Sequence, residues 1–92
     1  MEIKINAEEH RTLAKEIADR FDDNFIRVEL NGIELFITFK LDKLGYIEED
    51  TGAFVCTDIE FELDDISISN VDAELSYSEW TINKELRKLL ID

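Results

Sequence analysis

The fold of this chain is decided by the stretch Phe25-Ile-Arg-Val-Glu-Leu30, Asn31-Gly32, Ile33-Glu-Leu-Phe-Ile-Thr-Phe-Lys-Leu41. Two runs rich in β-branched and aromatic residues flank an Asn-Gly pair, the strongest short-range signal for a β-hairpin. Both turn residues tolerate positive φ, as a type I′ turn requires. The two-residue loop predicts the cross-strand pairs Leu30–Ile33, Val28–Leu35 and Ile26–Ile37. These apolar residues share one face, and a slip of one residue would bury Glu29 and Glu34 instead.

A helix is expected at each end of the chain. Asn6 is suited to cap the first, from about Ala7 to Phe21, and Glu9 completes a capping box. The apolar stripe of this helix consists of Leu13, Ala14, Ile17, Ala18 and Phe21. The second helix is expected from about Ile82 to Ile91. Two residues fit its N-cap equally well, Ser78 and Thr81.

Two more strands are expected after the hairpin. In the strand Phe54–Leu63, alternation directs one set of residues toward the core: Val55, Thr57, Ile59, Phe61 and Leu63. The other set faces away: Phe54, Cys56, Asp58, Glu60 and Glu62. After a break at Asp64-Asp65, the segment from Ile66 to Leu75 changes parity near Ser69-Asn70, which predicts an irregular fourth strand. Met1–Ile5 alternates and would add a short fifth strand at an edge.

These elements predict one α+β domain spanning residues 1–92. Its order is α-β-β-β-β-α, with a four-stranded antiparallel meander, or five strands if Met1–Ile5 pairs, and helices forming a second layer. A parallel α/β sheet is disfavoured because no helix lies between the strands to act as a crossover. Whether both helices lie on the same face of the sheet is left open by the sequence.

Charge is distributed unevenly along the chain. The net charge of the 92 residues is −13, and the segment 47–79 holds eleven acids and no base. This acidity disfavours direct contact with nucleic acid or anionic lipid. Cys56 is the one cysteine, the first residues do not resemble a signal peptide, and no apolar run is long enough to cross a membrane. We therefore expect a cytoplasmic protein.

Few residues point to catalysis. His10 is the single histidine, on the first turn of a helix, where packing or exposure to water is expected. Cys56 lies among carboxylates, which would suppress thiolate formation. Acidic pairs occur at expected turns, without the ligand spacing of a calcium loop, and no His/Cys set suits zinc. The sequence thus predicts no enzyme, no cofactor and no metal site, and it matches no family motif known to us.

Two sets of residues remain as candidate partner-binding sites. Asp58, Glu60 and Glu62 lie on the outward side of one strand, about 7 Å apart, which is close to the spacing of phosphates along a nucleic-acid strand. Without a base in their segment, these acids are expected to raise one another's pKa. The second set is the outward-facing phenylalanines Phe25, Phe36 and Phe54, which need a cover: a helix, a second copy or a target.

Three functions are compatible with these features. The leading hypothesis is a non-catalytic acidic interaction module that presents its acidic strand to a basic protein. That partner could be a nucleic-acid-binding protein, which the module would block by imitating nucleic acid. The alternatives are a small dimer joined by its phenylalanines, with acidity serving solubility, and an accessory subunit of an enzyme complex. The chain is accordingly expected to be a monomer or a homodimer.

Overall fold

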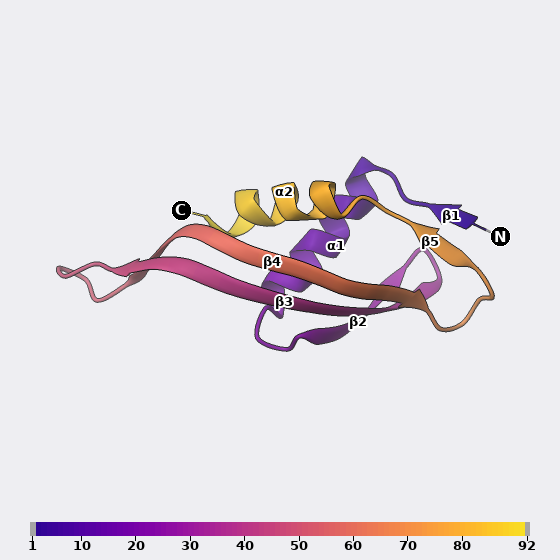
Figure 1. The fold of residues 1–92 in the computed structure, drawn as a ribbon, viewed down its shortest axis with the longest axis horizontal. Helices are drawn as coiled ribbons and strands as arrows, with labels where there is room; N and C mark the ends of the chain where they lie inside the picture. The colour runs from indigo at the N-terminus through magenta and orange to yellow at the C-terminus, as the bar shows by residue number, and fades with distance from the viewer. Residues whose placement is uncertain (1, 92) are drawn as a thin grey trace.

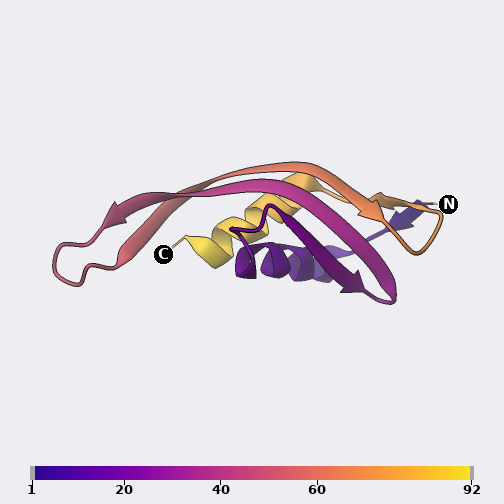
Figure 2. The ribbon, with the colours of Figure 1, turned by 90° about the horizontal axis from the view of Figure 1, so that it is seen from below.

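The computed structural model describes residues 2–91 as an elongated α+β fold measuring 53 × 22 × 19 Å (Figure 1). Its elements in chain order are β1 (Glu2–Lys4), α1 (Ala7–Asp19), β2 (Phe25–Leu30), β3 (Ile33–Ile47), β4 (Phe54–Ile68), β5 (Glu74–Ser76) and α2 (Glu79–Leu90). Strands β2, β3 and β4 form an arched antiparallel sheet, and both helices lie on its concave side (Figure 2). The expected two-layer α+β architecture is confirmed, and both helices cover the same face of the sheet.

The β2–β3 hairpin forms in the predicted register. Leu30 is the Cα partner of Ile33, and the pairs Val28–Leu35 and Ile26–Ile37 follow. Asn31 and Gly32 both have positive φ, 52° and 82°, as the two-residue turn requires. The paired apolar side chains lie on the concave side, all of them buried except the half-buried Ile33, which confirms that turn chemistry and hydrophobic pattern specify the same pairing.

Polar side chains tether this turn to distant parts of the chain. The Asn31 amide donates to Glu9, whose other carboxylate oxygen accepts from the Asn6 backbone N–H in the predicted capping box of α1. From the opposite side, the Asn70 amide donates to the Gly32 carbonyl at 3.1 Å and accepts from the Glu34 backbone N–H at 3.0 Å. The turn is therefore fixed to α1 and to the segment after β4.

The predicted third strand and the start of the predicted fourth form one continuous strand, β4, which contains two bulges. Thr57 and Asp64 have no Cα partner on β3, because the register shifts by one residue at each. Each extra residue reverses which side chains face the core. The prediction that Thr57 points inward and Cys56 outward is consequently wrong: Thr57 is exposed and Cys56 is buried.

The fold differs from the expected meander in two further ways. The antiparallel sheet has three strands, because the expected fourth strand is absorbed partly into β4. The chain then forms β5, which pairs in parallel with β1, with Glu2 opposite Glu74. Parallel strands need a long connection between them. Here that connection is nearly the whole domain, because β1 and β5 lie at opposite ends of the chain. Met1, at the start of the expected edge strand, lies outside the described residues.

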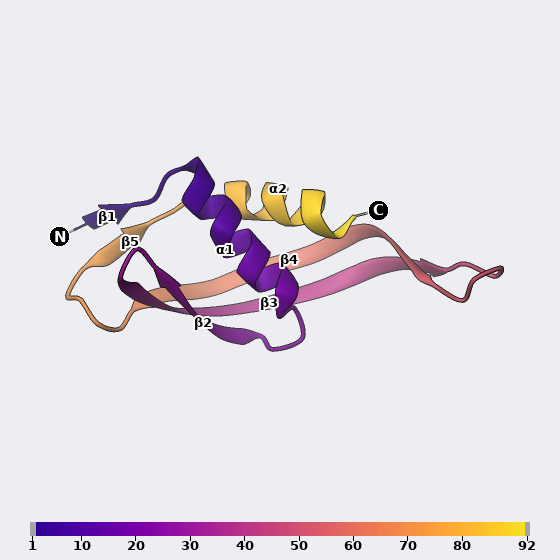
Figure 3. The same cartoon turned by 180° about the vertical axis from the view of Figure 1, so that it is seen from behind.

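The core lies between the concave side of the sheet and the two helices. Figure 3 shows α1 crossing in front of the sheet. The fully buried side chains come from both layers: Leu13 and Ile17 on α1, Leu35, Ile37 and Phe39 on β3, and Ile82 and Leu86 on α2. Helix α2 begins at Glu79 rather than Ile82, because the Ser78 hydroxyl accepts from the Thr81 N–H at 3.1 Å and serves as the N-cap. Helix α1 ends at Asp19, two residues before the expected end.

Candidate protein-interaction surface

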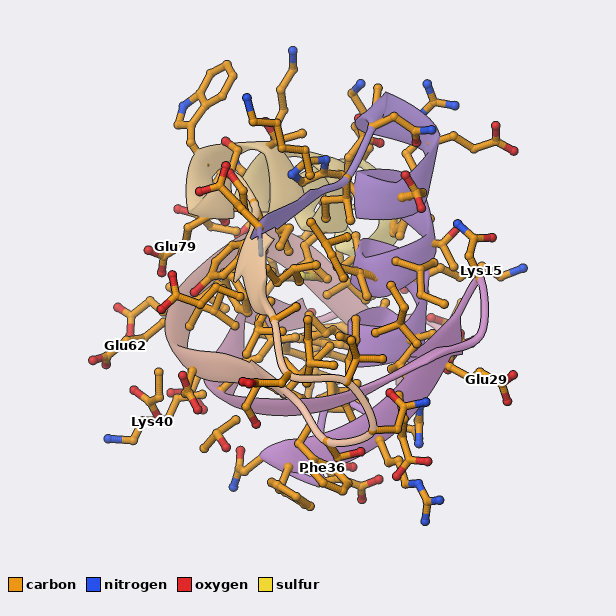
Figure 4. All side chains as sticks on the ribbon, turned by 90° about the vertical axis from the view of Figure 1, so that its right-hand side faces the viewer. Lys15, Glu29, Phe36, Lys40, Glu62 and Glu79 are labelled. Atoms are coloured by element: carbon orange, nitrogen blue, oxygen red, sulfur yellow. The ribbon has the colours of Figure 1, made fainter. Side chains whose placement is uncertain are left out.

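The convex side of the three-stranded sheet is left uncovered by the elements within residues 2–91 (Figure 2). Glu29, Phe36, Lys40 and Glu62 point outward from it, away from both helices (Figure 4). Alternation and register place these charged residues on the same side, called here the convex face: Arg27, Glu29, Glu34, Lys40, Asp42, Glu60, Glu62 and Asp65. Acids thus outnumber bases on a surface that the chain itself does not bury.

The middle of the convex face carries a like-charged pair. Asp42 on β3 is the Cα partner of Glu60 on β4, and the next pair on this face joins Lys40 to Glu62. These four residues, with Phe61, line a shallow hollow of about 290 Å³. Two carboxylates directly opposite each other across a sheet repel and destabilise it. Elsewhere on this face Glu34 is neutralised by Arg27 at 2.9 Å, but within residues 2–91 Asp42 and Glu60 form no ion pair.

Asp58 alternates with Glu60 and Glu62 along β4 but differs from them in having an ion-pair partner. It follows the bulge at Thr57 and pairs with Arg87 of α2, at 2.6 Å between Oδ1 and Nη1. The same carboxylate accepts from the Ile59 backbone N–H at 2.8 Å. The Ile59 hydrogen bond and then Arg87 lower the pKa of Asp58, which overturns the expected increase. No local sequence pattern links Asp58 to Arg87, because Arg87 lies on another element.

Asp42 is the site residue that the sequence reading missed. Its position opposite Glu60 follows from the β3–β4 register. Predicting that register from the sequence would have required knowledge of the bulge at Asp64. Besides Glu60 and Glu62 from the predicted acidic strand, the convex face thus carries Asp42 and Asp65, the latter across from Thr38. Asp58, Glu60 and Glu62 keep alternate positions on β4, but the carboxylate of Asp58 is ion-paired with Arg87.

The three phenylalanines do not form one patch. The rings of Phe25 and Phe36 stack on the convex face with centroids 5.7 Å apart and planes at 25°. Phe54 lies opposite Ile47 at the far end of β3, eleven residues from Phe36 and therefore about 35 Å along the strand. Alternation from the buried Leu41 places this pair on the concave side, so the prediction that Phe54 faces away from the core side is wrong. Neither helix covers Phe25 or Phe36, since both helices lie on the concave side. The stacked pair adds an apolar element to the acidic face.

His10 and Cys56, the two residues considered for catalysis, are both buried and hydrogen-bonded within the fold. His10 is buried, its Nδ1 donating to the Asn6 carbonyl at 2.7 Å and its Nε2 accepting from the Ser78 N–H at 2.9 Å. Cys56 is buried, and its Sγ donates to the Asp58 carbonyl. Among residues 2–91, no three His, Cys, Asp or Glu side chains converge in a way that could hold a metal ion.

Comparison with protein-family models, with curated proteins and with solved structures yields no match to this chain. No helix within the described residues is long and apolar enough to cross a membrane.

Proposed function

We propose that this protein is a non-catalytic binding module whose convex face binds a basic surface of another protein. The observation that carries the proposal is the opposed pair Asp42 and Glu60 on an uncovered face. Side chains directly opposite across a sheet have Cβ atoms about 4.5–5.5 Å apart, so their repulsion weakens the free protein. A lysine or arginine of a partner placed between the two carboxylates would convert this repulsion into attraction.

The composition of the face supports a protein partner rather than a small ligand. The hollow between Lys40 and Glu62 is shallow, and the stacked Phe25–Phe36 pair lies on the same face. An aromatic pair beside acids is suited to a surface that offers both apolar side chains and guanidinium groups. Acidic groups would also steer a basic partner during encounter, so association should be fast and should weaken as salt rises.

The test compares two triple variants of equal charge. Asp42→Asn, Glu60→Gln and Glu62→Gln neutralise the convex face, whereas Glu8→Gln, Asp19→Asn and Asp23→Asn neutralise exposed acids away from it. Each set changes the net charge from −13 to −10. Immobilised wild-type protein is exposed to cell lysate, and bound proteins are identified by mass spectrometry.

The proposal expects specific basic proteins to be retained by the wild type and by the control variant, and lost from the convex-face variant. Circular dichroism confirms that all three are folded. Equal loss from both variants would mean that only net charge matters. Equal retention by both would mean that the convex face is merely solvated, and either result overturns the proposal.

A further inference from the structure

The turn between β2 and β3 is a chemically reactive sequence as well as a hairpin turn. Asn31 is followed by Gly32, and none of the other four asparagines in the sequence is followed by glycine. In an Asn-Gly pair the backbone nitrogen of glycine can attack the side-chain amide carbon of asparagine, because glycine has no side chain to shield that nitrogen. The sequence therefore confines this reactivity to one position.

The structure leaves the attacking nitrogen accessible. Asn31 and Gly32 are both exposed, and a Cβ placed on Gly32 would meet no atom within 4 Å outside its chain neighbours. Within residues 2–91 the Gly32 N–H donates no hydrogen bond, so water and hydroxide can reach it. The Asn31 amide donates to Glu9 at the surface. A surface contact of this kind opens far more often than the core unfolds, and each opening releases the amide for attack.

We propose that Asn31 is a site of spontaneous deamidation, and that its conversion to a carboxylate releases the hairpin turn from α1. The Gly32 nitrogen bonds to the side-chain carbon of Asn31, and its proton leaves with the side-chain NH2 group as ammonia. Water then opens the resulting cyclic imide, adding OH to one of its two carbonyl carbons and a proton to the Gly32 nitrogen. Opening at the side-chain carbon gives aspartate. Opening at the main-chain carbon gives isoaspartate.

The product reverses the interaction with Glu9. One oxygen of the Glu9 carboxylate accepts from the Asn6 backbone N–H at 2.9 Å, and the other accepts from the Asn31 amide. After deamidation the amide donor is gone and two carboxylates face each other, so attraction is replaced by repulsion. The turn itself tolerates aspartate, because Asp-Gly forms the same type of turn as Asn-Gly. The loss therefore falls on the contact between the turn and the capping box of α1.

Isoaspartate has a second effect. Its backbone runs through the former side-chain carbon, so the two-residue loop becomes longer by one atom, and the length of this loop sets the register of the hairpin. Both products thus loosen the same corner of the fold. Neither involves the residues of the convex face, so this proposal is independent of the function proposed above.

Peptide mass spectrometry measures the reaction directly. The wild type is incubated at mildly alkaline pH and digested with trypsin, which releases residues 28–40 with Asn31 as their one asparagine. This peptide should show the mass change of NH2 replaced by OH and should separate into aspartate and isoaspartate forms. The other four asparagines are internal controls and should stay unchanged: Asn6, Asn24, Asn70 and Asn83. An unmodified Asn31, or one that reacts no faster than these four, would overturn the proposal.

Asn31→Asp imitates the aspartate product and tests its structural consequence. Its Tm, followed by circular dichroism, should be about 4–8 °C below that of the wild type, the shift expected for one lost charge-assisted hydrogen bond in a domain of this size. Adding Glu9→Gln should restore at least half of this loss. A glutamine oxygen still accepts from the Asn6 N–H, while its NH2 group donates to the introduced carboxylate.

Asn70→Asp is the matched control for charge. It also changes the net charge from −13 to −14, and it removes the amide that donates to the Gly32 carbonyl from the side of the turn opposite Glu9. Glu9→Gln should therefore not restore the stability of Asn70→Asp. If Asn31→Asp were as stable as the wild type, or if Glu9→Gln restored both variants equally, the carboxylate would not act through Glu9, and the proposed release of the turn would be refuted.

Discussion

Replacing His10 by leucine tests whether this buried ring joins the two helices. Leucine keeps an apolar side chain of similar size but removes the acceptor that Nε2 offers to the Ser78 N–H at 2.9 Å. Ser78 is the N-cap of α2, so its N–H would be left unsatisfied beside the helix start. An unsatisfied buried donor costs about 1–3 kcal/mol. The Asn6 carbonyl loses the Nδ1 hydrogen bond but keeps the His10 backbone N–H at 3.0 Å, so this end contributes less.

The expected total for His10→Leu is a loss of about 2–3 kcal/mol in the free energy of unfolding, measured by urea denaturation followed by circular dichroism. At the urea dependence typical of small domains, the midpoint should fall by about 1–2 M. His10→Gln is the matched control, because its amide oxygen can reach the position of Nε2 and should preserve more than half of the stability lost in the leucine variant. If leucine were as stable as glutamine, the hydrogen bond to Ser78 would not join the helices, and the reasoning would fail.

Two further predictions concern the β3–β4 pair. Gly45→Ala would place a Cβ 1.8 Å from the Val55 carbonyl oxygen, so the backbone must shift. We expect the free energy of unfolding, measured by urea denaturation, to fall by about 1–3 kcal/mol. The neighbouring exposed control, Thr57→Ala, should lower it by about 0.5 kcal/mol or less. Because the Ile59 N–H and Arg87 hold the pKa of Asp58 below its ordinary 3.8, the folded protein gains stability from this carboxylate above that value and loses it as pH falls through the lowered pKa. Asp58→Asn should therefore be less stable than the wild type at pH 7 and should approach it in acid; a difference that persists unchanged down to about pH 2 would contradict this linkage.

Local signals in the sequence were sufficient to predict the hairpin and the helix caps. The Asn31-Gly32 turn specifies its own register, because a two-residue loop leaves one pairing that buries the apolar residues on one side. The capping box of Asn6 and Glu9 is likewise contained in four consecutive residues. The choice between Ser78 and Thr81 could not be made locally. It depends on the imidazole of His10, which lies 68 residues earlier and accepts from the Ser78 N–H.

The bulges limited what could be predicted about the candidate surface. Strict alternation over Phe54–Leu63 assigned Cys56 to the outside and Thr57 to the core, but one unpaired residue at Thr57 exchanges them. The signal was present in Gly45: at this position β4 approaches so closely that a side chain would meet the Val55 carbonyl. An isolated glycine within a strand pattern is typical of such a close approach, and it lies opposite the register shift.

The same two bulges determine which side chains of β4 face the core. The bulge at Asp64 returns Ile66 to the concave side after Leu63, so β4 can follow β3 along its whole length and cover the core at one end while projecting from it at the other. The bulge at Thr57 places Cys56 on the concave side, and just beyond it Asp58 pairs with Arg87 of α2. Bulges increase local twist and bend the bulged strand. A uniformly alternating β4 would have kept Cys56 in water and Thr57 in the core, and it would have turned Ile66 away from the helices.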